Sequence, residues 1–371
     1  MKNLKFNQKI STLNLDKKLI FFCFSNGIAL LFGFFLYLLI IKTSDQNLAK
    51  LMFGYSIHLI LGSFLTFGSN LYIFNDICSK NEFAEKIQAL KNNIFFTLIL
   101  LSFSFLIVTF LSFLDYFISP YKKNFNLNLY PFFYTALVHA ANKILYFCFL
   151  GLRFFKFCYA IIVIKPIIIF FSIATFILFA NFAFEVSLLI SFIIGEIVIL
   201  LFFIRILSKI IALDSISLKT EYKKQISNSI KLFGEYIFAE IILKIDIFFS
   251  MLRFELKNIS IYLIALVFIE GLLSFTIVIR NYFSSQFGFL LNKKNPNDYI
   301  KQFKKYSFYS LMASVFFSLC SILILILMNK YLTEINFLVF KYLAIMVAGY
   351  LIYSYFAVSE LMFLNKKNYF K

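Results

Sequence analysis

The feature that most constrains this chain is a succession of apolar runs, each long enough to cross a lipid bilayer, separated by short polar segments. A transmembrane helix needs about 20 predominantly apolar residues. Ten runs of about this length or longer are present, and no loop is long enough for a soluble domain. The pattern therefore predicts an all-α polytopic membrane protein with about ten transmembrane helices. The runs cover approximately 19–41, 51–74, 94–118, 129–150, 158–180, 186–207, 230–252, 259–283, 306–328 and 337–363.

Composition excludes a soluble protein and argues against a nucleic-acid partner. Of the 371 residues, 61% are hydrophobic and 15% are charged, whereas soluble domains average about 25% charged residues. The formal net charge is +18, but the positive residues fall between the apolar runs instead of forming one block. Membrane lipids are the expected surroundings, and no nucleic-acid partner is expected.

The lysines and arginines predict the orientation of the helices. With the N-terminus placed in the cytoplasm, 23 of the 36 positive residues fall on cytoplasmic segments and seven on external ones. Cytoplasmic loops of membrane proteins carry such an excess. Both termini are therefore predicted to be cytoplasmic, and the expected location is a bacterial inner membrane.

The longest cytoplasmic loop suggests a division into two lobes. It separates six predicted helices from four, and parts of the two halves echo each other weakly, as in transporters built from repeats. The predicted units are a six-helix lobe over 1–207, a cytoplasmic linker over 208–229 and a four-helix lobe over 230–371.

Basic and amide side chains lie inside several of the predicted spans. His139 and Lys143 are one turn apart in the fourth span, with Asn142 beside them. They form either an anion-binding point or a lysine paired with a carboxylate that ties helices together. Lys165, which precedes Pro166, is interpreted as a lysine reaching out to the membrane interface. Arg280 lies towards the cytoplasmic end of its span.

Acidic side chains inside the spans are the second group of candidates. Ionisable residues at membrane depth are expensive and usually pair with one another or mark an ion pathway. Each acid forms either an interhelical salt bridge or a proton or sodium site. His58 is interpreted as a structural residue. The acidic candidates for ion coupling are Glu196, Glu240, Asp246 and Glu270.

The five cysteines predict neither a metal site nor a cofactor. They show no CxxC motif and no paired spacing with the two histidines. Buried apolar cysteines are the better interpretation.

Two short motifs resemble a known family. Lys244-Ile245-Asp246 ends one predicted helix and Ser260-Ile261-Tyr262 starts the next, and the first hairpin is followed by Thr66-Phe67-Gly68. Together with the hydropathy pattern, they resemble the polysaccharide and O-antigen flippases of the multidrug/oligosaccharidyl-lipid/polysaccharide (MOP) exporter superfamily. Members of that family usually have twelve or more helices, so the resemblance implies that the last helices are lacking here.

The resemblance implies a transporter and not an enzyme. The implied substrate is a lipid-linked (polyprenyl-diphosphate) oligosaccharide for O-antigen, capsule or a related polysaccharide, moved by alternating access and coupled to H+ or Na+. Contact with glycan polymerase machinery would follow. Two alternatives are a drug/cation antiporter of the same superfamily and a polysaccharide polymerase. The candidate substrate-binding residues, taken from the basic and amide side chains inside the spans, are His139, Asn142, Lys143, Lys165 and Arg280.

Overall fold

A computed structural model provides the structure of this chain. It describes residues 45–80, 82–118, 130–179, 182–210, 222–242, 296–331 and 337–366, together with parts of 21–39 and 262–283. Every regular element among these residues is an α-helix. The helices are α2 (Asp45–Phe64), α3 (Ser69–Ser79), α4 (Phe83–Ile118), α5 (Tyr130–Gly151), α6 (Phe155–Leu178), α7 (Phe184–Ile210), α8 (Tyr222–Ile242), α11 (Pro296–Tyr331) and α12 (Phe337–Lys366).

The described helices make this a multi-pass membrane protein. Six of them are long and apolar enough to cross a bilayer, and the bent pair α2–α3 would count as a seventh. The other three predicted spans, 19–41, 230–252 and 259–283, fall largely on residues outside the described part or only partly inside it. The cytoplasmic placement of both termini and the count of ten stay predictions.

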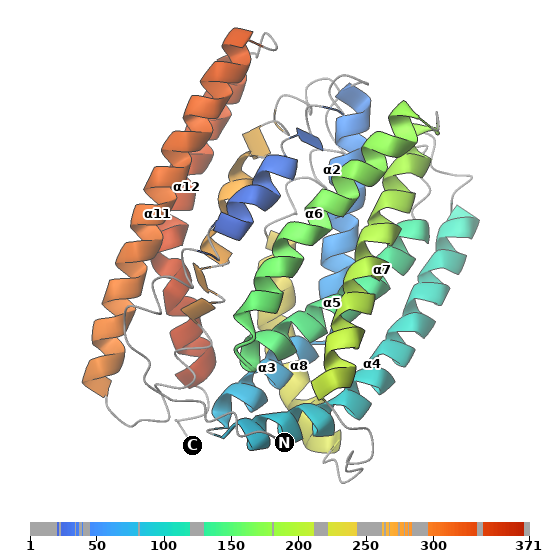
Figure 1. The fold of residues 1–371 in the computed structure, drawn as a ribbon, viewed down its shortest axis with the longest axis vertical. Helices are drawn as coiled ribbons and strands as arrows, with labels where there is room; N and C mark the ends of the chain where they lie inside the picture. Colours follow the sequence, from blue (N-terminus) through green and yellow to red (C-terminus); the bar gives the residue numbers. More distant parts are fainter. Residues whose placement is uncertain are drawn as a thin grey trace.

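Helix α5 lies at the centre of the first group of helices. It packs against α2, α3, α4, α6 and α7, while α11 and α12 form an antiparallel pair on one side of the molecule (Figure 1). One apolar cluster joins residues of α5, α6 and α7 to α11, α12 and the residues Ala265, Leu266, Phe268 and Ile269. Helix α8 begins at Tyr222, so the last eight residues of the predicted linker 208–229 are helical. The division into two lobes stays a prediction.

The second predicted span is not one straight helix. It is divided at residues 65–68 into α2 and α3, which meet at an angle of 54°. Gly68 has a φ of 72°, in the left-handed region that glycine adopts without steric cost. Broken helices at membrane depth need new partners for the freed backbone groups. The hydroxyl of Ser104 on α4 provides one, donating to the carbonyl of Leu65 at 2.9 Å.

The predicted orientation can be tested directly with reporter fusions. Fusions after Asn81, Ser215 and Asn295 are expected to report a cytoplasmic location, and fusions near Asn124 and Lys330 an external one. The reason is the excess of lysine and arginine in the segments assigned to the cytoplasm. Paired alkaline phosphatase and fluorescent-protein fusions would measure both sides. An external signal at Ser215 would contradict the assignment.

Candidate functional site

The candidate site is built around the carboxylate of Glu196, near the middle of α7. Glu196 is fully buried, in an apolar helix that packs closely against α6. The residue before it permits this approach, because a Cβ on Gly195 would lie 2.8 Å from Ile169 Cγ1 on α6. The sequence thus brings the neighbouring helix, and Lys165 on it, up to the carboxylate.

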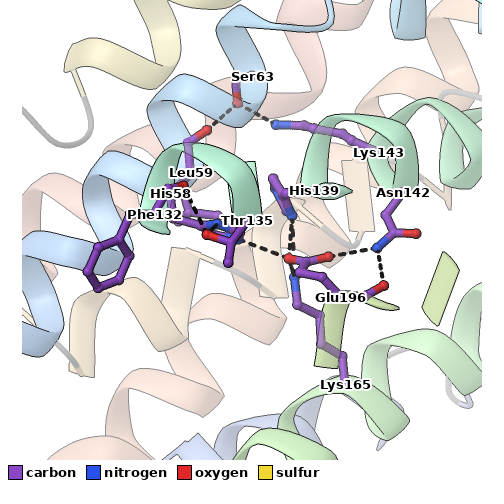
Figure 2. A network of polar contacts seen from close by, with 10 residues as sticks. All are labelled: His58, Leu59, Ser63, Phe132, Thr135, His139, Asn142, Lys143, Lys165 and Glu196. Atoms are coloured by element: carbon purple, nitrogen blue, oxygen red, sulfur yellow. Dashed lines mark hydrogen bonds and ion pairs between the residues drawn. The ribbon is translucent and has the colours of Figure 1, made fainter. Parts of the chain in front are cut away.

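Side chains from three other helices converge on this carboxylate (Figure 2). Glu196 Oε1 lies 2.5 Å from Lys165 Nζ of α6 and 2.9 Å from both His58 Nε2 of α2 and His139 Nδ1 of α5. Oε2 accepts a hydrogen bond of 2.7 Å from Asn142 Nδ2 of α5. The carboxylate therefore ties together three consecutive helices, α5, α6 and α7, and the more distant α2.

Burial explains why these contacts are needed. An uncompensated charge in a low-dielectric interior is costly, and removing one partner of a buried ion pair typically costs about 3–5 kcal/mol. The side chains of His58 and Glu196 are 0% and 1% exposed, whereas those of His139 and Lys165 are 14% and 21% exposed. The cluster is closed on the His58 side and partly accessible on the His139 and Lys165 side.

The hydrogen bonds of His58 determine where its protons lie. The Thr135 hydroxyl donates to the carbonyl of Phe132 at 2.9 Å, so its oxygen accepts from His58 Nδ1 at 3.1 Å. With a proton on Nδ1, the 2.9 Å contact between Nε2 and Glu196 Oε1 requires a second proton between them, because two lone pairs would otherwise face each other. The described geometry thus fits an imidazolium–carboxylate pair or a neutral imidazole beside a protonated Glu196.

Lys143 forms a separate contact one turn along α5 from His139. Its ammonium donates to Ser63 Oγ on α2 at 2.8 Å, and Ser63 in turn donates to the carbonyl of Leu59 at 2.8 Å. Lys143 is partly buried. It therefore lies near the cluster without contacting Glu196 in the network that Figure 2 shows.

No protein-family model matches the sequence, and no curated protein matches it. Solved structures do. A multidrug-resistance MATE-family transporter of the MOP superfamily, in an outward-facing conformation, superposes with a TM-score of 0.67 at 12% identity, over 94% of this chain and 82% of that one. A MOP-superfamily transporter from Pyrococcus furiosus gives 0.64 at 12% identity over 94% and 84%, and the MATE transporter ClbM in complex with Rb+ gives 0.60 at 13% identity over 93% and 81%.

The chain has the fold of the MOP-superfamily transporters. The likeness covers nearly all of this chain, so the superfamily fold predicted from the sequence is supported. The polysaccharide-flippase branch within the superfamily is a finer assignment, and it stays a prediction.

Within this MOP fold, two interpretations of single residues from the sequence are wrong. Lys165 does not reach out to the membrane interface, because its ammonium binds Glu196 and lies 3.3 Å from His139 Nδ1. His58 is not isolated on its helix, as the sequence suggested, since it contacts Glu196 directly and its ring stacks on Phe192 with 5.7 Å between centroids. A structural role for His58 stays a prediction. The partner of both residues, Glu196, lies on another helix, and the sequence of one helix does not show which side chains of another helix it will meet.

Three predicted substrate-binding residues of the fourth span have two different surroundings. His139 and Asn142 contact Glu196, whereas Lys143 contacts Ser63. It is His139 and Asn142 that contact a carboxylate, and both interpretations of Lys143, an anion-binding point or a pair with a carboxylate, stay predictions.

The remaining predicted site residues lie elsewhere in the MOP fold. Asp246 lies outside the described residues, and Glu240 lies in α8 with its side chain outside them. Glu270 and Arg280 are partly buried in the helical residues between 268 and 280, and they take no part in the contacts to Glu196 given above. Of the two predicted ion-coupling acids whose side chains are described, Glu196 and Glu270, it is Glu196 that lies in the cluster.

The cluster also contains ligand types that metals bind. One ligand atom each of His58, His139 and Glu196 lies within 4.8 Å of the others. The ammonium of Lys165 already supplies a positive charge at the carboxylate, so an ion would have to compete with it. Both histidines of the chain lie within predicted spans, and this shared membrane depth was the sequence signal that could have paired them.

Proposed function

We propose that this chain is a membrane transporter that moves an anionic amphiphile across the bacterial inner membrane by alternating access. The substrate class is a lipid-linked, polyprenyl-diphosphate oligosaccharide, exported for O-antigen, capsule or a related polysaccharide. The observation that carries the proposal is an excess of positive charge at the Glu196 cluster and at Lys143 beside it, inside a transporter fold.

The sign of the charge favours an anion over a cation. Lys143 and Lys165 carry two positive charges, and the proton between His58 and Glu196 leaves that pair without net charge. A low-dielectric cavity focuses such an excess and raises the local concentration of oppositely charged ligands. Diphosphates suit this arrangement because lysine ammonium groups bind phosphate oxygens through charge-assisted hydrogen bonds. Lys143 and Lys165 are the residues that we propose contact the diphosphate, with Arg280 as a further candidate.

Proton binding at the cluster supplies the coupling in this proposal. The contact between His58 and Glu196 already needs a shared proton, and His139 offers a second site that is partly accessible. Gain or loss of a proton changes the charge that the four helices must accommodate, so it biases their relative positions. We propose H+ as the coupling ion at Glu196, with Na+ as the alternative.

A drug/cation antiporter is the second candidate, favoured by one finding. Two of the solved structures reported above are MATE transporters, one of them a multidrug-resistance transporter. For the Pyrococcus furiosus transporter, a reversed polarity of the binding pocket was taken to suggest a different function. Pocket polarity is therefore a sensible criterion, and in this chain the cluster is net positive.

The experiment compares the two substrate classes in proteoliposomes that contain the purified protein. We expect translocation of a fluorescent polyprenyl-diphosphate oligosaccharide, accelerated by a pH gradient, and no efflux of a lipophilic cationic dye. Dye efflux without translocation of the lipid-linked sugar would support the antiporter instead. Empty liposomes and liposomes with the Glu196→Gln variant serve as controls.

Replacing Lys143 by methionine is expected to weaken binding of the lipid-linked substrate by about 10- to 100-fold, because a hydrogen bond to a charged group contributes about 1.5–3 kcal/mol. Titration of the purified protein with a soluble prenyl-diphosphate analogue would measure this change. Lys304→Met is the matched control, since Lys304 on α11 is exposed. Equal affinities for the two variants would remove Lys143 from the binding site.

A further inference from the structure

Helix α8 packs against the first group of helices at the point where the second span is broken. Among the described helices, its main contacts are with α2 and α3. A Cβ on Gly68, between those two helices, would lie 2.4 Å from the carbonyl oxygen of Ser229 and 2.8 Å from the amide nitrogen of Phe233 on α8. The backbones therefore meet directly here, and only glycine leaves room for the contact.

Aromatic rings close the same contact. The ring of Phe233 on α8 lies with centroids 5.3 Å from Phe64 and 5.8 Å from Phe67, and those two rings are 5.6 Å apart. Such ring pairs add about 0.5–1.5 kcal/mol beyond the area they bury. The three rings form an aromatic cluster between α8 and the break that separates α2 from α3.

Buried polar atoms on both sides of the contact lack hydrogen bonds. Asn70 Nδ2 on α3, and Gln225 Oε1 and Ser229 Oγ on α8, have no partner among the described residues. The three residues are 0%, 6% and 2% exposed. Each unsatisfied buried group costs about 1–3 kcal/mol. A permanent helix contact would be expected to pair these groups or to use apolar residues in their place.

A short chain of hydrogen bonds ends the contact on the side where α3 and α4 join. Gln225 Nε2 donates to Asn93 Oδ1 at 3.2 Å, and Asn93 Nδ2 donates to Asp76 Oδ2 at 2.8 Å. These bonds tie α8 to α4 and α3. The bond from Gln225 to Asn93, which is the one that reaches α8, joins two neutral amides and contributes about 0.5–1.5 kcal/mol. It therefore holds the contact without making it permanent.

We propose that the contact of α8 with the α2–α3 break is a gate, and that the described conformation has this gate closed. Separation of the helices would let water reach Asn70, Gln225 and Ser229, and the energy recovered would offset the loss of the aromatic contacts. The open and closed states of the gate then differ by a small free energy, as a transporter requires. The gate lies on the predicted cytoplasmic side, and this role rests on the proposed transport function.

The test measures the gate by itself, through the distance between spin labels on α4 and α8. Labels at Glu85→Cys and Ser227→Cys, both exposed positions, would be introduced into a variant without the five native cysteines and studied in lipid nanodiscs. We expect two distance populations. Gly68→Ala should move the population towards the longer distance by at least threefold, because its Cβ meets α8 backbone that cannot yield.

Two further variants sharpen the test. Gly234→Ala on α8 is the matched control, since a Cβ there meets nothing within 4 Å, and it should leave the distribution unchanged. Ser229→Ala removes an unsatisfied hydroxyl from the closed contact and should shift the population towards the shorter distance, so it tests the idea even where Gly68→Ala fails to fold. One distance, the same in wild type, Gly68→Ala and Ser229→Ala, would overturn the gate. A shifting gate in a protein that moves neither substrate class would leave the gate standing and reject the proposed function.

Discussion

Replacing Glu196 by glutamine is expected to abolish transport in proteoliposomes while the protein still inserts into the membrane. Glutamine keeps the shape of the side chain but leaves Lys165, His58 and His139 without the negative charge on which they converge. An isolated ammonium in this interior is costly, so the four helices are expected to separate or to bind a chloride ion in its place. Substrate-driven proton uptake, read from a pH-sensitive dye, is expected to disappear together with transport.

Two controls separate the role in transport from a role in stability. Glu85→Gln, at an exposed position near the start of α4, is expected to leave transport unchanged. The double variant Glu196→Gln/Lys165→Met removes both charges and should recover the thermal stability that Glu196→Gln loses, while transport stays absent. Recovery of transport in the double variant would show that the pair only ties helices together.

Replacing Gly62 by alanine is expected to lower transport at least tenfold, although the change adds one methyl group. On α2, a Cβ at this position would lie 2.6 Å from Cδ2 of His139 and 3.2 Å from the carbonyl oxygen of Ala136 on α5. The imidazole can move more easily than the backbone, so the ring is expected to shift away from Glu196. The cluster would then lose its partly accessible histidine.

Gly349→Ala is the matched control for this prediction. A Cβ at Gly349 on α12 meets nothing within 4 Å, and alanine in a helix interior is about 0.5–1 kcal/mol more favourable than glycine. That variant should therefore transport normally and melt at the same or a slightly higher temperature. Normal transport by Gly62→Ala would mean that the position of His139 does not matter for the transport cycle.

The hydropathy of the sequence predicted the helices well where each one is a continuous apolar run. The predicted spans 129–150, 158–180 and 186–207 correspond to α5, α6 and α7 within a few residues at each end. Helices α4 and α11 begin about ten residues before the predicted spans, because their first turns are polar and carry no hydropathy signal. The break between α2 and α3 was also missed, because Leu65, Thr66 and Phe67 are apolar enough to continue a run and hydropathy does not report a change of backbone direction.

The identity of the candidate site was only partly predictable. Glu196, His139, Asn142 and Lys165 were recognisable as expensive side chains inside apolar runs, because the bilayer penalises them whatever their neighbours are. Their partners were not recognisable. His58 and Glu196 are separated by 138 positions in the chain, and no periodicity within one helix reports which face of another helix it will meet.

The sequence by itself determined that this chain is a polytopic helical membrane protein, because the cost of burying backbone and charge in lipid acts on each segment independently. Only the tertiary structure decided which buried charges meet. Close packing of α5, α6 and α7, with α2 beside them, brings two histidines and a lysine to one carboxylate. Gly62 and Gly195 allow those close approaches, and the sequence alone does not show which helix packs against each glycine.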